Sequence, residues 1–379
     1  MTKVYLDRQI SKTPILVDIF LLITVVSLVI FSLLMIYSAT GVVATEKYNS
    51  PYFFVKRQAI AVIIGFVGMY FLSNLKVFSL KKFSHYFIFF IFILLGLTFI
   101  PGLSHSSGGA TRWINLPFLK FQPAELVKIF YVIFLAGYYH RQQEKIGTFI
   151  YGIFIPLAYT SLVAAVLLAQ PDFGSSAVLC FVTIAMAIAV GVKIRHLLIC
   201  SVPIILAVIG LIITSPYRLK RILVFLSPGE DVLGRGYQLS QSLIAVSSGE
   251  LTGVGIGKSM QKLYFLPAAH TDFIFAVIAE EFGFIGSVIL ILAFCVILWR
   301  GLAVAKVVTQ DIFAYCLAIG ATMLLVIPAF FNVGVVTGML PTKGLVLPLI
   351  GYGGSSMICS LWTVGLLLAL VKYRYRNAI

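Results

Sequence analysis

The stretch "LVDIFLLITVVSLVIFSLLMIYS", from Leu16 to Ser38, sets the class of this protein. Asp18 is its only charged residue, and the run is as long as the roughly 20 apolar residues that an α-helix needs to cross a bilayer. Of all 379 residues, 60% are hydrophobic and 11% are charged, whereas soluble domains carry about 25% charged residues. These values favour a membrane protein.

Nine similar runs follow the first. They are continuous rather than alternating, which excludes a transmembrane β-barrel. Helices are the other structure that satisfies every backbone polar group in lipid, so we predict an all-α polytopic membrane protein. The sequence has no internal repeat and no linker, which favours a single domain over residues 1–379. The ten predicted spans cover residues 16–38, 58–75, 85–102, 122–139, 147–169, 173–192, 196–214, 271–299, 312–333 and 346–371.

The distribution of Lys and Arg predicts the orientation. An even number of spans places both termini on one side, and the short loops on that side hold 15 basic residues against 6 in the opposite short loops. Because cytoplasmic loops carry the excess of Lys and Arg, we expect both termini in the cytoplasm. The net charge of +15 is too diffuse for nucleic acid, so we expect no nucleic-acid partner. Most of this charge is expected to face anionic lipid headgroups.

A long loop, 215–270, separates the seventh and eighth predicted spans and lies on the outer side in this topology. Its positive charge has no topological purpose and indicates an anionic ligand such as a phosphate, although an ordinary solvated loop is the alternative. Its "GYQLSQSLIAVSSGEL" is compatible with a short helix, and its "RLKRILVFL" with an interfacial one. The loop holds Arg218, Lys220, Arg221, Arg235, Lys258 and Lys262 against Glu230, Asp231 and Glu250.

Two charged residues stand together in the fourth predicted span. Glu125 and Lys128 are three residues apart, which places them on one helix face as an ion pair. Pro123, just before them, suits the first turn of that helix. The pair has either a purely structural role or a place in a wet cavity, since buried ion pairs stabilise proteins poorly.

The segment "HTDFIFAVIAEEFG", from His270 to Gly283, places acids in another span. Asp272 is expected at its outer mouth, where it could perform chemistry. Glu280 and Glu281 lie roughly 12–14 Å deeper, where we expect cations or hydroxyl groups of neighbouring helices as their partners. His270 could tune Asp272 or bind a metal, but a lone histidine near an interface more often does neither.

The last outer loop, "GMLPTKGLVLPLIGYGGSS" from Gly338 to Ser356, interrupts a helix with prolines and glycines. Broken helices at membrane depth are tolerated where they line a cavity. Lys343 lies in the break, and its point charge suits a phosphate. The alternative is a tight loop whose glycines permit close helix packing.

Four motifs in order, "TRWINLPFLKFQPAELVK", "AQPDFGSS", "HTDFIFAVIAEEFG" and "MLPTKGLVLPLIGYGGSS", are similar to those of the shape, elongation, division and sporulation (SEDS) family. The resemblance extends over nearly the whole chain, and "LPTKG" resembles the cell-division branch. It departs in "KLYFLPAA" (262–269), which lacks the glutamates of many relatives, and at Gly351, where "SYGGSS" is commoner.

The resemblance implies a peptidoglycan glycosyltransferase that polymerises lipid II at the outer face of the cytoplasmic membrane, at the division septum. Asp272 corresponds to the family's essential aspartate, and Glu125 and Lys128 to residues that line the same cavity. Arg112 and Lys343 correspond to further implicated residues. The implied partners are lipid II, a class B penicillin-binding protein with transpeptidase activity, and other membrane proteins of the division machinery.

The chemistry requires inversion at the anomeric carbon. We predict Asp272 as the general base and Arg112 and Lys343 as cations for the departing diphosphate, with His270 also near the substrate. A divalent cation such as magnesium or manganese could share this task, but the sequence has no dedicated ligand cluster, so no metal site is assigned. One alternative is a lipid II flippase or other transporter, because transporters also have charged residues near the membrane midplane and broken helices. Another is a scaffold that recruits the transpeptidase.

Overall fold

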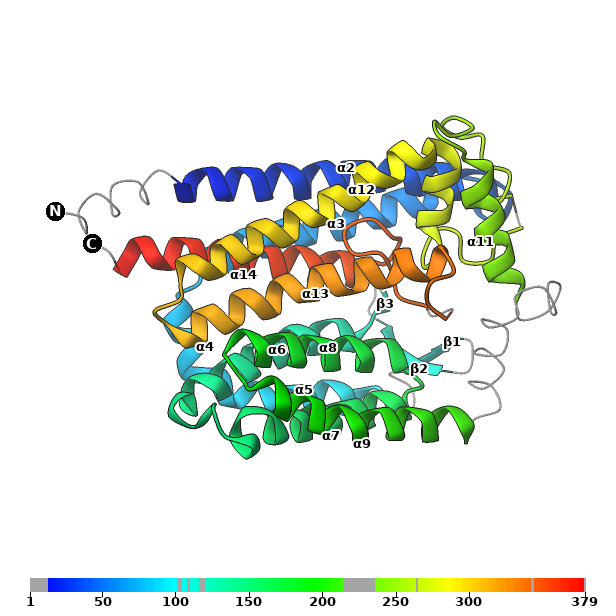
Figure 1. The fold of residues 1–379 in the computed structure, drawn as a ribbon. Helices are drawn as coiled ribbons and strands as arrows, with labels where there is room; N and C mark the ends of the chain where they lie inside the picture. Colours follow the sequence, from blue (N-terminus) through cyan, green and yellow to red (C-terminus); the bar gives the residue numbers. More distant parts are fainter. Residues whose placement is uncertain are drawn as a thin grey trace.

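The computed structural model describes residues 13–100, 104–107, 110–115, 120–214, 236–263, 265–341 and 344–377. The described part is a bundle of long helices that run roughly side by side, with a small sheet at one end (Figure 1). The predicted helical class is confirmed. The helices are α2 (Thr13–Tyr48), α3 (Phe53–Ser73), α4 (Val77–Phe83), α5 (Phe87–Leu97), α6 (Pro123–Arg141), α7 (Ile155–Ala169), α8 (Phe173–Ala189), α9 (Ile194–Ile213), α11 (Tyr237–Ser248), α12 (Ile274–Val307), α13 (Ile312–Val336) and α14 (Gly354–Asn377).

Each of the ten predicted spans overlaps helices of this bundle. Among the described residues, seven continuous helical stretches are long and apolar enough to cross a membrane. Shorter apolar stretches are α8, at 173–189, and the first half of α9, at 194–203. The number of crossings stays a prediction. The largest differences at helix ends are in the first and eighth spans, where α2 continues to Tyr48 and α12 to Val307, and in the last, where α14 begins only at Gly354. Pro348 and the following glycines keep residues 344–353 out of the helix.

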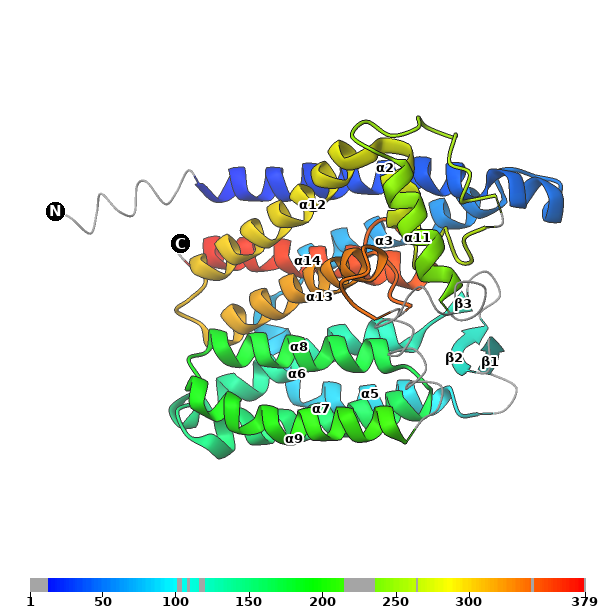
Figure 2. The ribbon, with the colours of Figure 1, turned by 45° about the vertical axis from the view of Figure 1, so that its right-hand side comes forward.

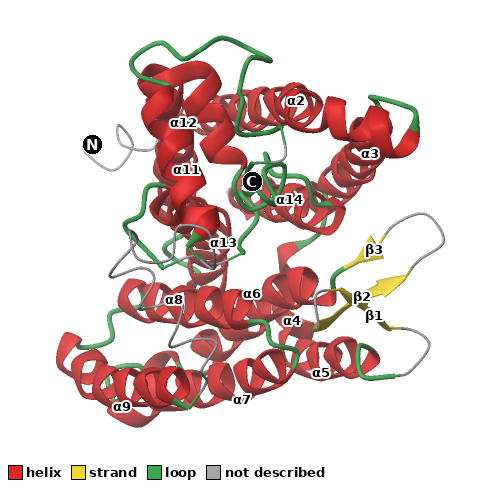
Figure 3. Ribbon diagram, turned by 90° about the vertical axis from the view of Figure 1, so that its right-hand side faces the viewer, coloured by secondary structure: helices red, strands yellow, loops and turns green. Residues whose placement is uncertain are grey.

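The bundle has two groups of helices, as the view along it shows (Figure 3). One group contains α2, α3, α12 and α14, and the other contains α5, α6, α7, α8 and α9. Between them, α13 contacts both α12 and α14 on one side and α6 and α8 on the other. Of the most apolar 18-residue stretch of α13, 78% is buried inside the protein, so α13 is a central helix and not a lipid-facing one.

A three-stranded antiparallel sheet lies in the chain between α5 and α6. It consists of β1 (Ser104–Ser107), β2 (Ala110–Asn115) and β3 (Lys120–Phe121), in the order β1-β2-β3. The sheet leads directly into α6, and Pro123 occupies the first turn of this helix, as predicted. Figure 2 shows β1 to β3 at the same end of the bundle as α11, the short helix predicted from "GYQLSQSLIAVSSGEL". The predicted interfacial segment "RLKRILVFL" lies outside the described residues.

The long helix α12 is interrupted at Gly283, which has φ 65° and ψ −161°. The chain between α11 and α12 fills this break. The amides of Val254 and Gly255 donate to the carbonyls of Glu280 and Glu281 at 3.0 and 3.1 Å. The amides of Phe284 and Ile285, which a continuous helix would pair with those carbonyls, donate instead to Glu250 and Leu251, at 2.9 and 3.1 Å. These four bonds satisfy the backbone groups that the break releases.

Candidate active site

Asp272 lies just before the first residue of α12, and its side chain is partly exposed. Its backbone carbonyl accepts a hydrogen bond from Asn332 Nδ2 at 2.7 Å. The same nitrogen donates to the carbonyl of Leu345, also at 2.7 Å. Asn332 belongs to α13 and is 1% exposed, so one buried amide group fixes both the start of α12 and the loop before α14.

The loop before α14 approaches the Asp272 carboxylate closely. A Cβ added to Gly344 would lie 2.5 Å from Asp272 Oδ2, so only a glycine fits here without movement of the aspartate. Lys343, the preceding residue and the predicted phosphate ligand, lies outside the described residues. Its proximity to Asp272 therefore stays a prediction.

The predicted ion pair of α6 is present. Lys128 Nζ donates to Glu125 Oε1 at 2.8 Å, and the two side chains are 10% and 17% exposed. The start of α6 is bonded to the start of α14, since the amide of Gln122 donates to Ser355 Oγ at 2.9 Å. The segment 344–355 thus contacts Asp272 at one end and the helix turn that carries Glu125 at the other.

His270 is packed between aromatic rings. Its ring centroid lies 5.4 Å from that of Phe54 and 5.6 Å from that of Tyr352. Burial, together with the positive charge of Lys47, lowers the pKa of His270, which favours the neutral imidazole. His270 and Lys47 line a cavity of about 220 Å³ between α2, α3 and the 262–270 segment.

Arg112 has backbone partners. Its Nε donates to the carbonyl of Gln170 at 3.0 Å, and its Nη2 donates to the carbonyl of Pro171. These carbonyls follow the end of α7, and the next residue, Asp172, caps α8 by accepting from the Ser175 amide at 3.2 Å. The motif "AQPDFGSS" therefore forms a helix–helix turn that Arg112 binds. This arrangement gives Arg112 a structural role beside the predicted role at the diphosphate.

The two deep glutamates have the kinds of partner that the sequence predicts, but most come from a loop. Glu280 accepts from the Ser259 hydroxyl and from the Met260 amide, the latter at 2.9 Å. Glu281 Oε1 accepts from Lys262 Nζ at 2.8 Å and from the Ser38 hydroxyl of α2 at 2.6 Å. These bonds attach the 259–262 segment to the broken part of α12.

The basic residues of the long loop are placed only in part. Lys262 forms an ion pair with Glu281, and Lys258 is exposed. Arg218, Lys220, Arg221 and Arg235 lie outside the described residues. Within the described ranges, no three His, Cys, Asp or Glu side chains gather in a group that could hold a metal ion. A magnesium or manganese ion at this site therefore stays a prediction.

Asn332 is the site residue that the sequence analysis missed. Its signal was a lone amide side chain within the apolar run that forms α13, four residues after Pro328. Polar residues within a span are expensive, so such a residue indicates a specific partner.

The chain is similar to known proteins over most of its length. Residues 19–376 match the family model described as Cell cycle protein, the family of FtsW, RodA and SpoVE. The chain is 40% identical over 361 residues to a probable peptidoglycan glycosyltransferase FtsW from Geobacter sp. (strain M18), which covers 95% of this chain and 98% of that protein. It is 37% identical over 356 residues to stage V sporulation protein E from Bacillus subtilis (strain 168), which covers 94% of this chain and 97% of that protein.

Two solved structures have the same fold. One is a chain from a study of the structural coordination of polymerization and crosslinking by a peptidoglycan synthase complex. It superposes with a TM-score of 0.77 at 28% identity and covers 94% of this chain and 98% of that chain. The other is the rod shape determining protein RodA of Thermus thermophilus, with a TM-score of 0.67 at 25% identity, which covers 94% of this chain and 96% of that chain.

Proposed function

Because this chain belongs to the FtsW, RodA and SpoVE family of cell cycle proteins, we propose that it polymerises lipid II into β-1,4-linked glycan strands with Asp272 as the general base. It is a multi-pass membrane protein and a peptidoglycan glycosyltransferase, the activity for which its FtsW relatives are named. The predicted resemblance to the SEDS family is thereby confirmed, while the roles of individual residues belong to this proposal.

The reaction is a single displacement. The acceptor's 4-hydroxyl oxygen attacks the anomeric carbon of the donor sugar, and its proton passes to the Asp272 carboxylate. The bond between the anomeric carbon and the phosphate oxygen breaks, and undecaprenyl diphosphate leaves with the electron pair. This step inverts the α-linkage of lipid II to the β-linkage of the polymer, and it requires no acid because a diphosphate is already a good leaving group.

The proposed function rests mainly on the placement of Asp272. Its carboxylate is partly exposed at the start of α12, against the Gly344 backbone, while the residues that follow it in α12 are buried. A general base needs this combination of access to the substrate and fixed position. Asn332 supplies the fixed position through the backbone of Asp272 and of Leu345.

Cations for the diphosphate come from Lys343 and from the N–H groups of Arg112 that its backbone partners leave available. Glu125 and Lys128 line the cavity of the substrate on the α6 side, and His270 supports the substrate as a neutral imidazole. A magnesium or manganese ion that arrives with the diphosphate is part of the substrate in this proposal, since magnesium is commonly held by one or two carboxylates together with substrate phosphates.

We further propose that the chain acts in the cytoplasmic membrane at the division septum, with both termini in the cytoplasm. Its partners are a class B penicillin-binding protein that cross-links the new strands, and other membrane proteins of the division machinery. The likeness to a chain of a complex that coordinates polymerization and crosslinking supports the first partner. The excess of basic residues in the loops on the termini's side supports the orientation.

Incubation of the purified protein with its transpeptidase and fluorescent lipid II tests the proposal. Glycan ladders on a gel are the expected result, and they disappear with Asp272→Asn. Movement of labelled lipid II across vesicles without any ladder would instead identify a transporter. Ladders of unchanged yield from the Asp272→Asn protein would refute the assignment of the base.

A further inference from the structure

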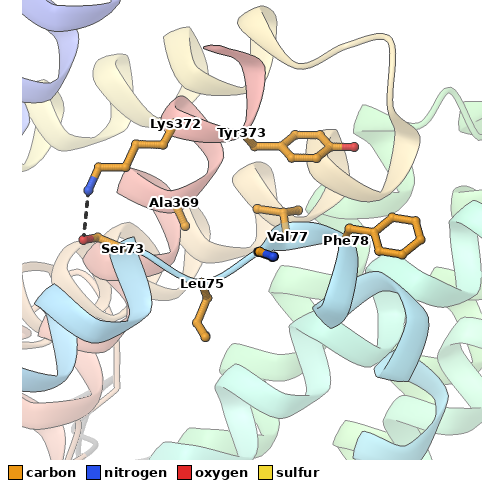
Figure 4. A pocket seen from close by; sticks show the side chains of 8 residues that line it. Ser73, Leu75, Val77, Phe78, Ala369, Lys372 and Tyr373 are labelled. Atoms are coloured by element: carbon orange, nitrogen blue, oxygen red, sulfur yellow. Dashed lines mark hydrogen bonds between the residues drawn. The ribbon is translucent and has the colours of Figure 1, made fainter. Parts of the chain in front are cut away.

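A cavity of about 170 Å³ lies at the end of the bundle that carries the α14 C-terminus, away from Asp272 (Figures 1 and 4). It is bounded by the last residue of α3, the turn into α4 and the final turns of α14. Three candidate spans end there, Phe53–Ser73, Val77–Leu97 and Gly354–Tyr373, which places the cavity at a membrane–water boundary.

Close packing of two helices produces the cavity. A Cβ on Gly365 of α14 would lie 2.8 Å from the Met69 carbonyl of α3, so these helices touch at their backbones. After Ser73 the chain turns away into α4 and leaves the α14 surface. Val77 and Ala369, which are both 2% exposed, line the bottom of the space between α4 and α14.

The cavity is positively charged. Lys76 and Lys372 line it, and its lining contains no acid. Lys372 Nζ donates to Ser73 Oγ at 3.3 Å and to Asn74 Oδ1 at 3.1 Å, whereas the side chain of Lys76 is exposed and makes no hydrogen bond or ion pair within the described residues. Figure 4 shows Lys372 extended toward Ser73, with the hydrogen bond between them drawn as a dashed line.

An acid that contacts a lining residue is already neutralised. Asp311 accepts from the Tyr373 hydroxyl at 3.0 Å, and its carboxylate is paired with Lys81 at 3.2 Å. Lys81 thus balances Asp311, and the charges of Lys76 and Lys372 remain for an anion.

The rim of the cavity is apolar and exposed. Phe78 is 66% exposed and Leu75 42% exposed, and Phe71 of α3, four residues before Leu75, is 66% exposed. Exposed apolar side chains such as these face hydrocarbon in a spanning protein. A soluble anion would not contact them, whereas a phospholipid would place its acyl chains against them.

We propose that this cavity binds the headgroup of an anionic phospholipid from the inner leaflet, with the phosphate between Lys76 and Lys372 and the acyl chains along Phe71, Leu75 and Phe78. Basic pockets between helices on the cytoplasmic side are suited to such headgroups. The inner leaflet follows from the orientation that the loop charges predict. The proposal does not depend on the glycosyltransferase activity, because the cavity and Asp272 lie at opposite ends of the bundle.

Reconstitution into nanodiscs of phosphatidylcholine with a minor fraction of phosphatidylglycerol tests this site. After extraction in mild detergent, mass spectrometry measures the phosphatidylglycerol that stays with each mole of protein. Lys76→Gln is expected to lower this retention about fivefold, the ratio that corresponds to one lysine at an anionic surface, and Lys76→Gln with Lys372→Gln lowers it further. The matched control is Lys193→Gln with Lys306→Gln, two exposed lysines of the same predicted membrane face, and it is expected to retain the lipid as the unaltered protein does.

Because Lys76 has no internal bond to lose among the described residues, its glutamine variant separates lipid binding from folding. The expected result is reduced retention at an unchanged melting temperature. Equal retention by the cavity variants and the control would overturn the proposal. Complete displacement of the lipid by millimolar inorganic phosphate would also overturn it, because that result would identify a site for a free anion.

Discussion

Lys262 and Glu281 form a buried ion pair 2.8 Å long, with side chains that are 6% and 0% exposed. Lys262 comes from the segment before α12, Glu281 from within α12, and the Ser38 hydroxyl of α2 bonds both of them. Three separate parts of the chain therefore meet at one charged pair. Glu281 Oε2 has no hydrogen-bond partner among the described residues, so the carboxylate depends on the partners of its other oxygen.

Lys262→Met is expected to destabilise the protein strongly, because it leaves the Glu281 carboxylate buried without a countercharge. Removal of one partner of such a pair typically costs about 3–5 kcal/mol. Thermal unfolding in detergent measures the loss, and adding Glu281→Gln to Lys262→Met should restore much of it. Lys258→Met, an exposed lysine of the same segment, serves as the control and should change stability by less than about 0.5 kcal/mol. Equal effects of Lys258→Met and Lys262→Met would contradict the role of the pair.

Gly283→Ala should also destabilise the protein, by about 3 kcal/mol, since the backbone conformation at the break is restricted almost entirely to glycine. A Cβ there would lie 2.4 Å from the Gly253 nitrogen. Gly96→Ala is the matched control, because Gly96 is helical and a Cβ added to it would meet no described atom within 4 Å. It should be neutral or stabilise by about 0.5–1 kcal/mol. A Gly283→Ala protein as stable as the unaltered one would show that the break is not required.

Asp272→Asn keeps the shape of the side chain but removes the carboxylate that we propose as the base. We expect kcat for glycan synthesis to fall by about 10²–10⁴-fold, the usual contribution of general base catalysis, at an unchanged melting temperature. Gel analysis of glycan ladders at several times measures the rate. Glu144→Gln, which removes an exposed carboxylate elsewhere, should leave the rate unchanged.

Asn332→Asp is nearly isosteric but lacks the N–H groups that hold the carbonyls of Asp272 and Leu345. Each carbonyl left without its donor costs about 1–3 kcal/mol. We expect kcat to fall by about 10²-fold with little change in KM, because a displacement of about 1 Å at the base has an effect of that size. Thr322→Val in the same helix removes only a bond to the Ala318 carbonyl and should keep kcat. If KM alone changed, Asn332 would act on substrate binding and not on the position of Asp272.

The pH dependence of stability should reveal Asp311. Burial raises its pKa, but the hydrogen bond and charge of Lys81, with hydrogen bonds from Tyr373 and the Phe313 amide, lower the pKa below its ordinary value. A lowered pKa means that the folded protein favours the ionised form, so this stabilisation is complete above about pH 4 and is lost as the pH falls through the folded pKa. The difference in melting temperature between the unaltered protein and Asp311→Asn should therefore shrink below about pH 4. A constant difference down to about pH 3 would contradict it.

Local patterns predicted the features that depend on neighbouring residues. Apolar length predicted the helices, the proline rule predicted the start of α6 at Pro123, and a spacing of three predicted the pair of Glu125 and Lys128. Each of these features depends only on residues within one helix, and their order in the sequence shows it directly.

The features that the sequence did not reveal pair distant residues. The bonds of Arg112 reach carbonyls 58 and 59 residues away, and Asn332 joins two segments on either side of it. The filling of the α12 break by residues 250–255 requires the register of two segments about 30 residues apart. No local pattern encodes such a register, and the strand β1, "SHSS", lacks the β-branched and aromatic residues typical of strands.

The break in α12 at Gly283, where the chain between α11 and α12 supplies the backbone hydrogen bonds, also divides this helix into two parts. The residues from Ile274 to Glu281 are all buried in protein, whereas Phe284, Ile289 and Trp299 beyond the break are each about 60% exposed. A thicker or thinner bilayer therefore acts on the second part and on the outer helices, which adjust by tilting. The first part is held by the inserted chain and by α13, so we expect the Asp272 carboxylate to keep its depth in membranes of different thickness.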